Sequence, residues 1–146
     1  METKNKSNII VGDTSALISM VIESDSKHSD ALAGAQYLTT KQSTILIPAE
    51  VLAETVNVLG KKFDRKHAIA TGRRLTKDEA FIVVETNELV RSRALDLMEK
   101  AADSGSYIDC IVVATGEQYA STNIYGFDRY FKQQGFPFPA AEEDEA

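Results

Sequence analysis

The feature that most constrains the fold is a series of short apolar runs, each ending at a turn residue or an acid. The first run, Ile9 to Gly12, is followed at once by Asp13, and the residues after Asp13 favour a helix. A short β-branched run that ends at a turn residue is typical of a strand buried in a parallel sheet. We therefore expect Asp13 to lie where a buried strand ends and a helix begins. Open parallel sheets bind their ligands at this edge.

Similar runs recur along the chain and alternate with helical stretches. Strands are predicted at about 8–12, 44–47, 80–84 and 123–127, with 136–138 as a candidate edge strand. Helices are predicted at about 14–23, from a cap at Ser29 or Asp30 onward, and at 49–62, 65–75, 87–102, 106–116 and 129–134. This alternation predicts an α/β fold with a mainly parallel sheet of four to five strands and helices on both faces.

Helical periodicity also predicts which side chains face the core. In 49–62 an apolar stripe places Glu54 half-buried at its margin and Glu50 in solvent. The stripe consists of Val51, Leu52, Thr55, Val56 and Leu59. In the helix after Ser29 we expect Leu32, Ala35, Tyr37 and Leu38 to face inward, and in 87–102 Leu89, Val90, Ala94, Leu95 and Met98. The segment 106–116 is apolar nearly all round, which predicts a buried helix.

Length and composition predict a single domain with a real core. The chain has 146 residues, of which 43% are apolar and 26% charged. We expect this domain to span 8–139, between a disordered polar segment 1–7 and a disordered acidic tail 140–146. No apolar run approaches the roughly 18 residues of a membrane span, and no signal-type stretch follows Met1, so a cytoplasmic protein is expected. The single Cys110 excludes an internal disulfide and a cysteine-built metal site.

Charge is spread unevenly along the chain. The net charge of −6 argues against broad, sequence-independent binding of nucleic acid. Residues 61–77, however, hold seven Lys or Arg residues against the single Asp64. This basic segment is either a solvated helical face or a patch that guides phosphate. In the second case Lys61, Lys62, Arg73 and Arg74 are candidate substrate-binding residues.

Four carboxylates occupy positions that this fold would bring together: Asp13 and Asp128 follow apolar strands, and Glu54 and Asp109 lie on apolar helix flanks. Burying an unpaired carboxylate costs several kcal/mol. Lys and Arg are absent from the sequence immediately around Asp13, Glu54 and Asp109. A divalent cation would supply the missing charge, and an all-oxygen ligand set favours Mg²⁺ or Mn²⁺ over zinc.

Simpler roles for the same acids remain open. Asp13 and Asp128 both precede helices and can serve as N-caps, which contribute about 1 kcal/mol each. Asp109 can complete a capping box with Ser106. Glu54 has no cap to make, and its simpler role is a surface pair with a nearby cation.

An acid cluster with a bound Mg²⁺ ion suits hydrolysis of a phosphodiester by water, since the ion offsets phosphate charge and lowers the pKa of a bound water. No side-chain nucleophile is then required. Cys110 lies in an apolar helix without an activating His beside it. Both histidines, His28 and His67, stand in polar helical surroundings without a partner at metal-ligand spacing, which indicates surface roles.

Four segments in order carry a resemblance to a known family: Asp13-Thr14-Ser15-Ala16-Leu17 after a strand, Pro48 to Glu54 opening a helix, Ser106 to Asp109, and Phe127-Asp128. Over about residues 8 to 139 they resemble PIN-domain proteins, and in particular the VapC-type toxin ribonucleases of prokaryotic toxin–antitoxin pairs. The resemblance implies a three-layer α/β/α PIN-like fold. It also implies a Mg²⁺ site and catalysis at Asp13, Glu54, Asp109 and Asp128, RNA as substrate, a homodimer, and silencing by an antitoxin.

One position departs from the family pattern. Family members often carry Thr or Ser two residues before the last acid, where this chain has Gly126, so the role of Asp128 is the least secure of the four. Thr14 and Ser15 can supply hydroxyls near the metal or to a substrate, and they can equally cap the helix after Asp13.

Other classes fit the sequence less well. A haloacid-dehalogenase-type phosphatase needs a second Asp where Ser15 stands, a metal-dependent adhesion module needs Ser where Leu17 stands, and a receiver domain needs an acid pair where Gly12 precedes Asp13. Two alternatives stay open within the resemblance: a PIN nuclease of RNA processing or ribosome maturation, and a non-catalytic PIN-fold binding module.

Overall fold

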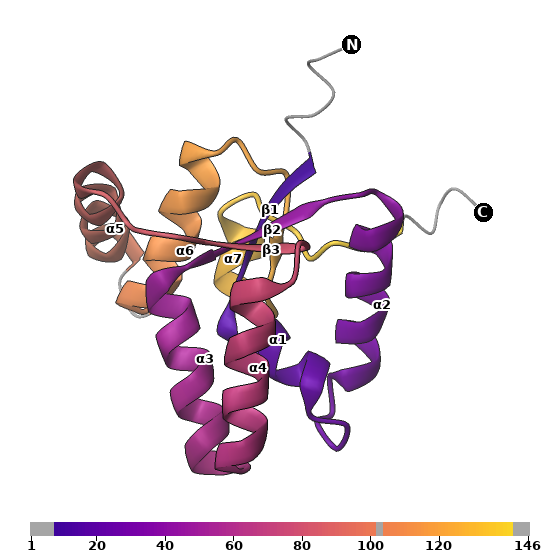
Figure 1. The fold of residues 1–146 in the computed structure, drawn as a ribbon. Coiled ribbons are helices and arrows are strands. Elements are labelled where there is room, and N and C mark those ends of the chain that lie inside the picture. Colours follow the sequence, from indigo (N-terminus) through magenta and orange to yellow (C-terminus); the bar gives the residue numbers. More distant parts are fainter. Residues whose placement is uncertain (1–7, 102–103, 142–146) are drawn as a thin grey trace.

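A computed structural model describes residues 8–101 and 104–141 (Figure 1). The predicted disordered segment 1–7 and residues 142–146 of the predicted acidic tail lie outside these ranges. In chain order the described elements are β1 (Ile9–Gly12), α1 (Thr14–Val21), α2 (His28–Thr40), β2 (Thr44–Pro48), α3 (Ala49–Lys62), α4 (Arg65–Lys77), β3 (Phe81–Val84), α5 (Glu88–Ala101), α6 (Tyr107–Gln118), β4 (Ile124–Tyr125) and α7 (Arg129–Gln133).

The four strands form one sheet in the order β3-β2-β1-β4, and all neighbouring strands are parallel. Ile10 pairs with Ile45 in β2, and Val11 pairs with Ile124 in β4. The chain therefore moves outward from β1 through β2 to β3 and then returns past β1 to β4. The predicted three-layer α/β/α architecture is confirmed, with four strands in the described part of the chain.

This reversal divides the helices between the two faces. Because crossovers between parallel strands are right-handed, α1 to α4 lie on one face of the sheet and α5 and α6 on the other (Figure 1). α6 packs on β1, β2 and β4, and α3 and α4 pack on each other and on β2 and β3. The point where strand order reverses lies between β1 and β4, and this is where α/β sheets of this kind bind ligands.

The core consists of the strands and the side chains that face them. Val11, Ile47 and Ile111 are among its fully buried members. Residues 110–116 of α6 are all buried, as their apolar sequence predicts. No helix within the described ranges combines the length and the apolar character that a bilayer crossing requires.

The predicted inward face of α5 is partly wrong. Val90, Ala94 and Leu97 are buried, whereas Leu89, Leu95 and Met98 are exposed by 76%, 56% and 42%. α5 packs mainly against α6, so α6 covers only the narrow stripe of Val90, Ala94 and Leu97, which are spaced four and three residues apart. Leu89, Leu95 and Met98 face away from the protein.

Three smaller expectations are also corrected. Residues 136–138 form no strand; the Pro137 carbonyl accepts bonds from the Ile124 N–H at 3.3 Å and from the Asn123 side-chain amide at 3.1 Å. α2 begins at His28 without a side-chain cap from Ser29 or Asp30, and its Leu32 is exposed. Glu50 is half-buried rather than in solvent, because its Oε1 accepts a 2.6 Å bond from the Thr86 hydroxyl.

Candidate active site

The four acids reach the strand-reversal edge from four separate elements. Asp13 directly follows β1, and its N–H donates to the carbonyl of Tyr125 in β4 at 2.9 Å. Asp128 lies between β4 and α7, while Glu54 lies in the second turn of α3 and Asp109 in the first turn of α6. Because the carboxyl ends of parallel strands share one edge, acids that follow β1 and β4 are neighbours.

Asp13 is buried, with only 4% of its surface exposed. Its Oδ2 accepts two bonds from Ser15, from the backbone N–H at 3.1 Å and from the hydroxyl at 2.8 Å. Burial raises the pKa of Asp13 to about 6, and the charges of Asp109 and Glu54 act in the same direction, against the two Ser15 bonds. Asp13 is thus an N-cap that sits in an environment unfavourable to its own negative charge.

Two hydroxyl groups position the Glu54 side chain near Asp13. The Thr14 hydroxyl donates to Glu54 Oε1 at 2.7 Å, and the buried Thr55 hydroxyl donates to Thr14 Oγ1 at 3.2 Å. The half-buried position predicted for Glu54 is confirmed. Sequence reasoning assigned Thr55 to the apolar stripe and missed this chain of bonds. The signal was a hydroxyl at a buried helical position, since such a group needs a partner.

Asp109 and Asp128 also make the caps that the sequence allowed. Asp109 completes a capping box: its Oδ2 accepts from the Ser106 N–H and its own N–H donates to Ser106 Oγ, both at 3.1 Å. Asp128 Oδ1 accepts from the Tyr130 N–H at 2.8 Å. Burial raises the pKa of Asp109, and the charges of Asp128 and Glu54 raise it further.

The two roles weighed for these acids are therefore compatible. Each of the three aspartates bonds its own helix start through one carboxylate oxygen. The charges of Asp109 and Glu54 help to raise the pKa of Asp13, and those of Asp128 and Glu54 help to raise the pKa of Asp109, so the four acids lie within electrostatic reach of one another. Within the described residues, none of the ion pairs gives any of the four a Lys or Arg partner. In the described part of the chain, this cluster of negative charge therefore has no basic ion-pair partner.

The fit of a metal ion to this cluster rests on the donor set and on the buried charge of Asp13. Hard carboxylate and hydroxyl oxygens are the ligands that Mg²⁺ and Mn²⁺ prefer. Among residues 8–101 and 104–141, no three His, Cys, Asp or Glu side chains are gathered closely enough to hold an ion as they stand. Mutual repulsion favours such spreading, and a side-chain rotation at the exposed Asp128 costs about 1 kcal/mol, the contribution of its cap on α7. The donor chemistry of these residues fits such an ion.

The presence of glycine at position 126, in place of the family's Thr or Ser, has a steric explanation. A Cβ at this position would lie 2.7 Å from the Cβ of Asp13 and 2.7 Å from the Phe131 ring. A Ser or Thr cannot be accommodated here without a shift of Asp13 or of α7. The departure from the family pattern therefore accompanies a close approach between the β4–α7 turn and Asp13.

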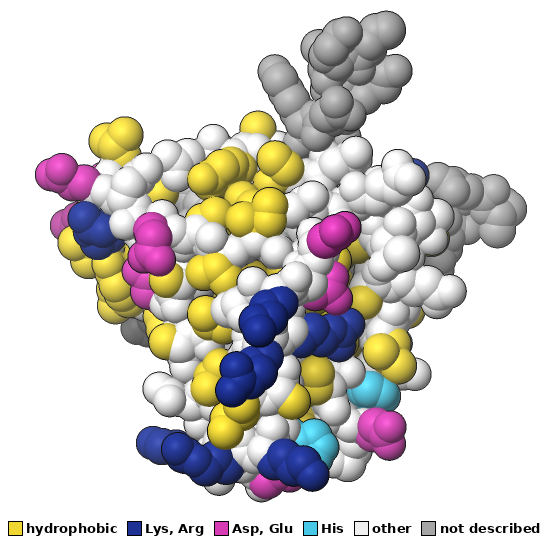
Figure 2. Space-filling model, viewed as in Figure 1, with side chains coloured by type: hydrophobic (Ala, Val, Ile, Leu, Met, Phe, Trp, Pro, Cys, Tyr) yellow, Lys and Arg dark blue, Asp and Glu magenta, His cyan; other side chains and the backbone are white. Residues whose placement is uncertain are grey.

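The remaining predicted site residues fall into two groups. Thr14 and Ser15 point their hydroxyls at Glu54 and Asp13, so they position acids. Lys61, Lys62, Arg73 and Arg74 are exposed on the α3–α4 hairpin, where Figure 2 shows basic side chains gathered on one face. Arg74 is the one of these that also has an acidic neighbour within the described ranges, Asp78 at 3.8 Å.

The fold and the acidic edge define a class of α/β nuclease-like domain. Comparison with known proteins identifies the family within that class. The sequence model of the PIN domain family matches residues 10–137, so the chain belongs to this family. It is 26% identical over 126 residues to a VapC ribonuclease of Aquifex aeolicus, covering 85% of this chain and 90% of the relative.

A solved structure shares the fold. The crystal structure of Mycobacterium tuberculosis VapC20, described as a sarcin–ricin loop cleaving toxin, superposes with a TM-score of 0.76. The match covers 87% of this chain and 95% of VapC20 at 21% identity, which supports a common fold.

Proposed function

We propose that the protein is a metal-dependent endoribonuclease of the VapC type, the toxin of a toxin–antitoxin pair that acts on RNA in the cytoplasm. The family match and the relative named VapC ribonuclease support a ribonuclease over the other PIN-domain roles. The four acids, all present, argue against a binding module without catalysis. Of the two enzymatic alternatives, both named relatives favour the toxin over a nuclease of RNA maturation.

The observation that carries the proposal is the buried charge of Asp13. A carboxyl whose pKa is raised to about 6, beside further acids and without a basic partner in the described ranges, is an expensive arrangement for a purely structural cap. A divalent cation removes that cost. Asp13, Glu54, Asp109 and Asp128 would hold it, with Mg²⁺ or Mn²⁺ as the metal. When bound, the ion supplies charge neutralisation at the scissile phosphate and activation of the attacking water.

The chain's own part in the reaction is to position these acids and to keep them available. Ser15 fixes the Asp13 carboxylate through two bonds, and Thr14, supported by Thr55, fixes Glu54. Thr14 and Ser15 both lie in the first turn of α1, which directly follows β1 and Asp13. Preorganised groups of this kind need little rearrangement when the transition state forms.

RNA is a polyanion, and the acidic edge repels it. The exposed basic segment offsets this repulsion from outside the site, since Lys61, Lys62, Arg73 and Arg74 carry positive charge on the hairpin that includes Glu54. We propose that these residues bind phosphates away from the cleaved bond and set the salt dependence of binding.

Two protein partners belong to the same proposal. An antitoxin would silence the enzyme by occupying the acidic edge. A second copy of the chain would form a homodimer, and the exposed apolar side chains of α5 are available for burial in such an interface.

The experiment is the substitution Asp109→Asn, assayed for cleavage of RNA with and without Mg²⁺. Asn retains an oxygen that can accept the Ser106 N–H, so the α6 cap persists while the charge is lost. We expect Mg²⁺-dependent cleavage to fall by at least about 100-fold, in line with losses of essential groups in active sites. Asp96→Asn, an exposed acid on α5, is the matched control and should cleave like the parent. Equal activity of the Asp109→Asn variant and the parent would end the assignment.

A further inference from the structure

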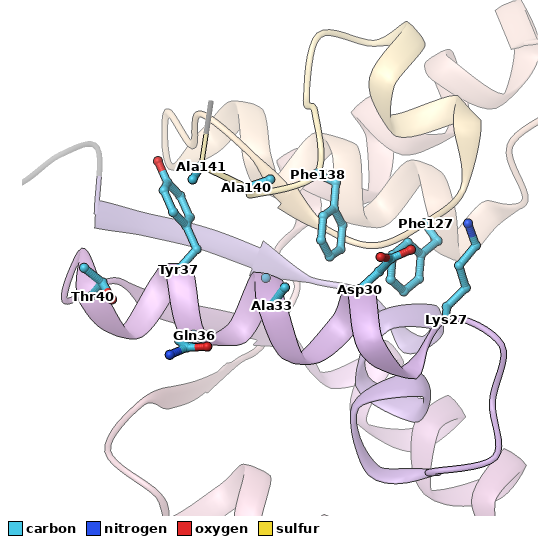
Figure 3. Close-up of a pocket in the computed structure, with 11 residues that line it drawn as sticks. Lys27, Asp30, Ala33, Gln36, Tyr37, Thr40, Phe127, Phe138, Ala140 and Ala141 are labelled. Atoms are coloured by element: carbon cyan, nitrogen blue, oxygen red, sulfur yellow. The ribbon is translucent and has the colours of Figure 1, made fainter. Parts of the chain in front are cut away.

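A cavity of about 860 Å³ lies between α2 and the C-terminal segment that follows α7 (Figure 3). Five side chains give it its character: Lys27, Asp30 and Tyr37 from α2 and its start, and Phe127 and Phe138 from the opposite wall. We call it the α2 groove. Its size is within the range of small-ligand sites, which is about 300–1,000 Å³.

The groove has an aromatic wall with charge at one end. Phe127 and Phe138 stack with ring centres 4.6 Å apart, and Tyr37 stands further along α2 (Figure 3). The Lys27 ammonium lies 5.5 Å from the centre of the Phe127 ring. Gly34 makes the narrow floor possible, since a Cβ there would lie 2.7 Å from the Phe138 ring. The three rings are only partly buried and therefore remain accessible from the cavity.

The charged end of the groove adjoins the acidic site. Phe127 directly precedes Asp128, and its N–H donates to the Ser15 hydroxyl at 2.9 Å. That hydroxyl in turn donates to Asp13 at 2.8 Å. The backbone of a residue that lines the groove is therefore linked to Asp13 by two successive hydrogen bonds. The groove and the acidic edge are therefore neighbours through the segment Phe127-Asp128.

We propose that the α2 groove binds an unpaired nucleotide of the RNA substrate, next to the nucleotide that carries the scissile phosphate. This inference rests on the proposed ribonuclease function. Lys27 contacts the phosphate at the end near Phe127, and the base lies against the wall formed by Phe138 and Tyr37. Asp30 accepts a hydrogen bond from a 2′-hydroxyl or from an exocyclic amine of the base.

Three observations favour RNA over other occupants. Aromatic side chains beside a lone cation are the usual means of holding unstacked bases and their phosphates. Its Phe127 wall directly precedes Asp128, and the Phe127 backbone is linked through Ser15 to Asp13, so the groove lies next to the acids where the phosphodiester would be cleaved. The Asp30 carboxylate and the Tyr37 phenol can also form hydrogen bonds with the hydroxyls and amines of a nucleotide. A purely apolar site for a peptide would lack such groups.

The test measures binding of a 5′-fluorescein RNA octamer library of random sequence, with every variant made in the Asp109→Asn background so that RNA is not cut. Tyr37→Leu should raise Kd roughly 5- to 100-fold, the loss expected for one stacked base. Lys27→Gln should reduce the slope of log Kd against log salt by about 0.7, the value for one phosphate contact with single strands. Tyr119→Leu and Lys100→Gln, outside the groove lining, are the matched controls and should bind like the Asp109→Asn parent.

The outcomes separate the groove from the ribonuclease proposal. If the wild-type protein neither binds nor cleaves RNA, both proposals fall. If it cleaves RNA while Tyr37→Leu and Lys27→Gln bind the octamers like their parent, only the groove assignment is overturned. A synthetic peptide of residues 140–146 provides a further arm. If the two variants lose affinity for this acidic peptide and not for RNA, the groove is a protein-docking surface and the assignment is equally overturned.

Discussion

Replacing Asp13 by Asn should stabilise the metal-free protein at neutral pH. Asn is as good an N-cap as Asp, and its oxygen can keep the bond from the Ser15 N–H, so the exchange removes mainly the buried charge. The pKa of Asp13 is about 6 in the folded protein against 3.8 for the free side chain. At 1.36 kcal/mol per unit, this difference corresponds to about 3 kcal/mol.

The direction of the pH dependence follows from which state, folded or unfolded, binds the Asp13 proton more tightly. The folded protein holds the Asp13 proton better than the unfolded chain does, so this group favours folding most at low pH. Its contribution is fully present below about pH 4 and is lost as pH rises through about 6. The Asn variant lacks this loss. The advantage of the variant should therefore be near zero at pH 4 and about 3 kcal/mol at pH 7.5.

Urea denaturation in EDTA between pH 4 and pH 7.5 measures this difference directly. Other groups also titrate in that range, and the comparison of the two proteins cancels them to first order. Mg²⁺ at 100 times its Kd should stabilise the wild type by about 2.7 kcal/mol and the variant much less. Parallel stability curves across the pH range, without a widening gap above pH 5, would refute the claim that Asp13 is buried at a cost.

Further predictions concern the neighbours of this centre and the outer faces. Thr14→Val should weaken Mg²⁺ binding about 10- to 100-fold in calorimetry by releasing Glu54, whereas Thr76→Val, whose hydroxyl bonds only its own helix, should not. Gly126→Ser should cost about 1–3 kcal/mol in urea denaturation because its Cβ overlaps Asp13, while Gly60→Ala, with one ordinary 3.7 Å contact, should gain about 1 kcal/mol. Leu95→Lys should lower the mass seen in sedimentation if α5 joins two copies; an unchanged dimer would place that interface elsewhere.

The alternation of apolar runs and amphipathic stretches sufficed to predict most of the fold. β1, β2, β3 and the helices α3, α4 and α6 lie within a few residues of their predicted positions, because burial of a strand or a helix face leaves a periodic trace in the sequence. The α/β/α layering followed from the same alternation.

Local rules failed where a neighbour from far along the chain decided the outcome. Leu89, Leu95 and Met98 look like core residues, yet α5 packs mainly against α6 and buries other positions. Glu50 has a solvent-facing position on its own helix, and Thr86 from the β3–α5 connection half-buries it. Neither partner can be inferred from helical periodicity, because both depend on how separate elements pack.

The acids themselves were visible in the sequence as carboxylates at the ends of apolar segments, and so was their chemistry. The sequence alone did not determine that Thr14 and Thr55 form one chain to Glu54, nor that Gly126 admits Asp13 so closely. Nor did it reveal the groove beside Phe127, whose walls are nearly a hundred residues apart in the chain. Residue type and periodicity are local properties of a chain, whereas hydrogen-bond partners, steric clearance and cavities arise only when distant segments share the same space.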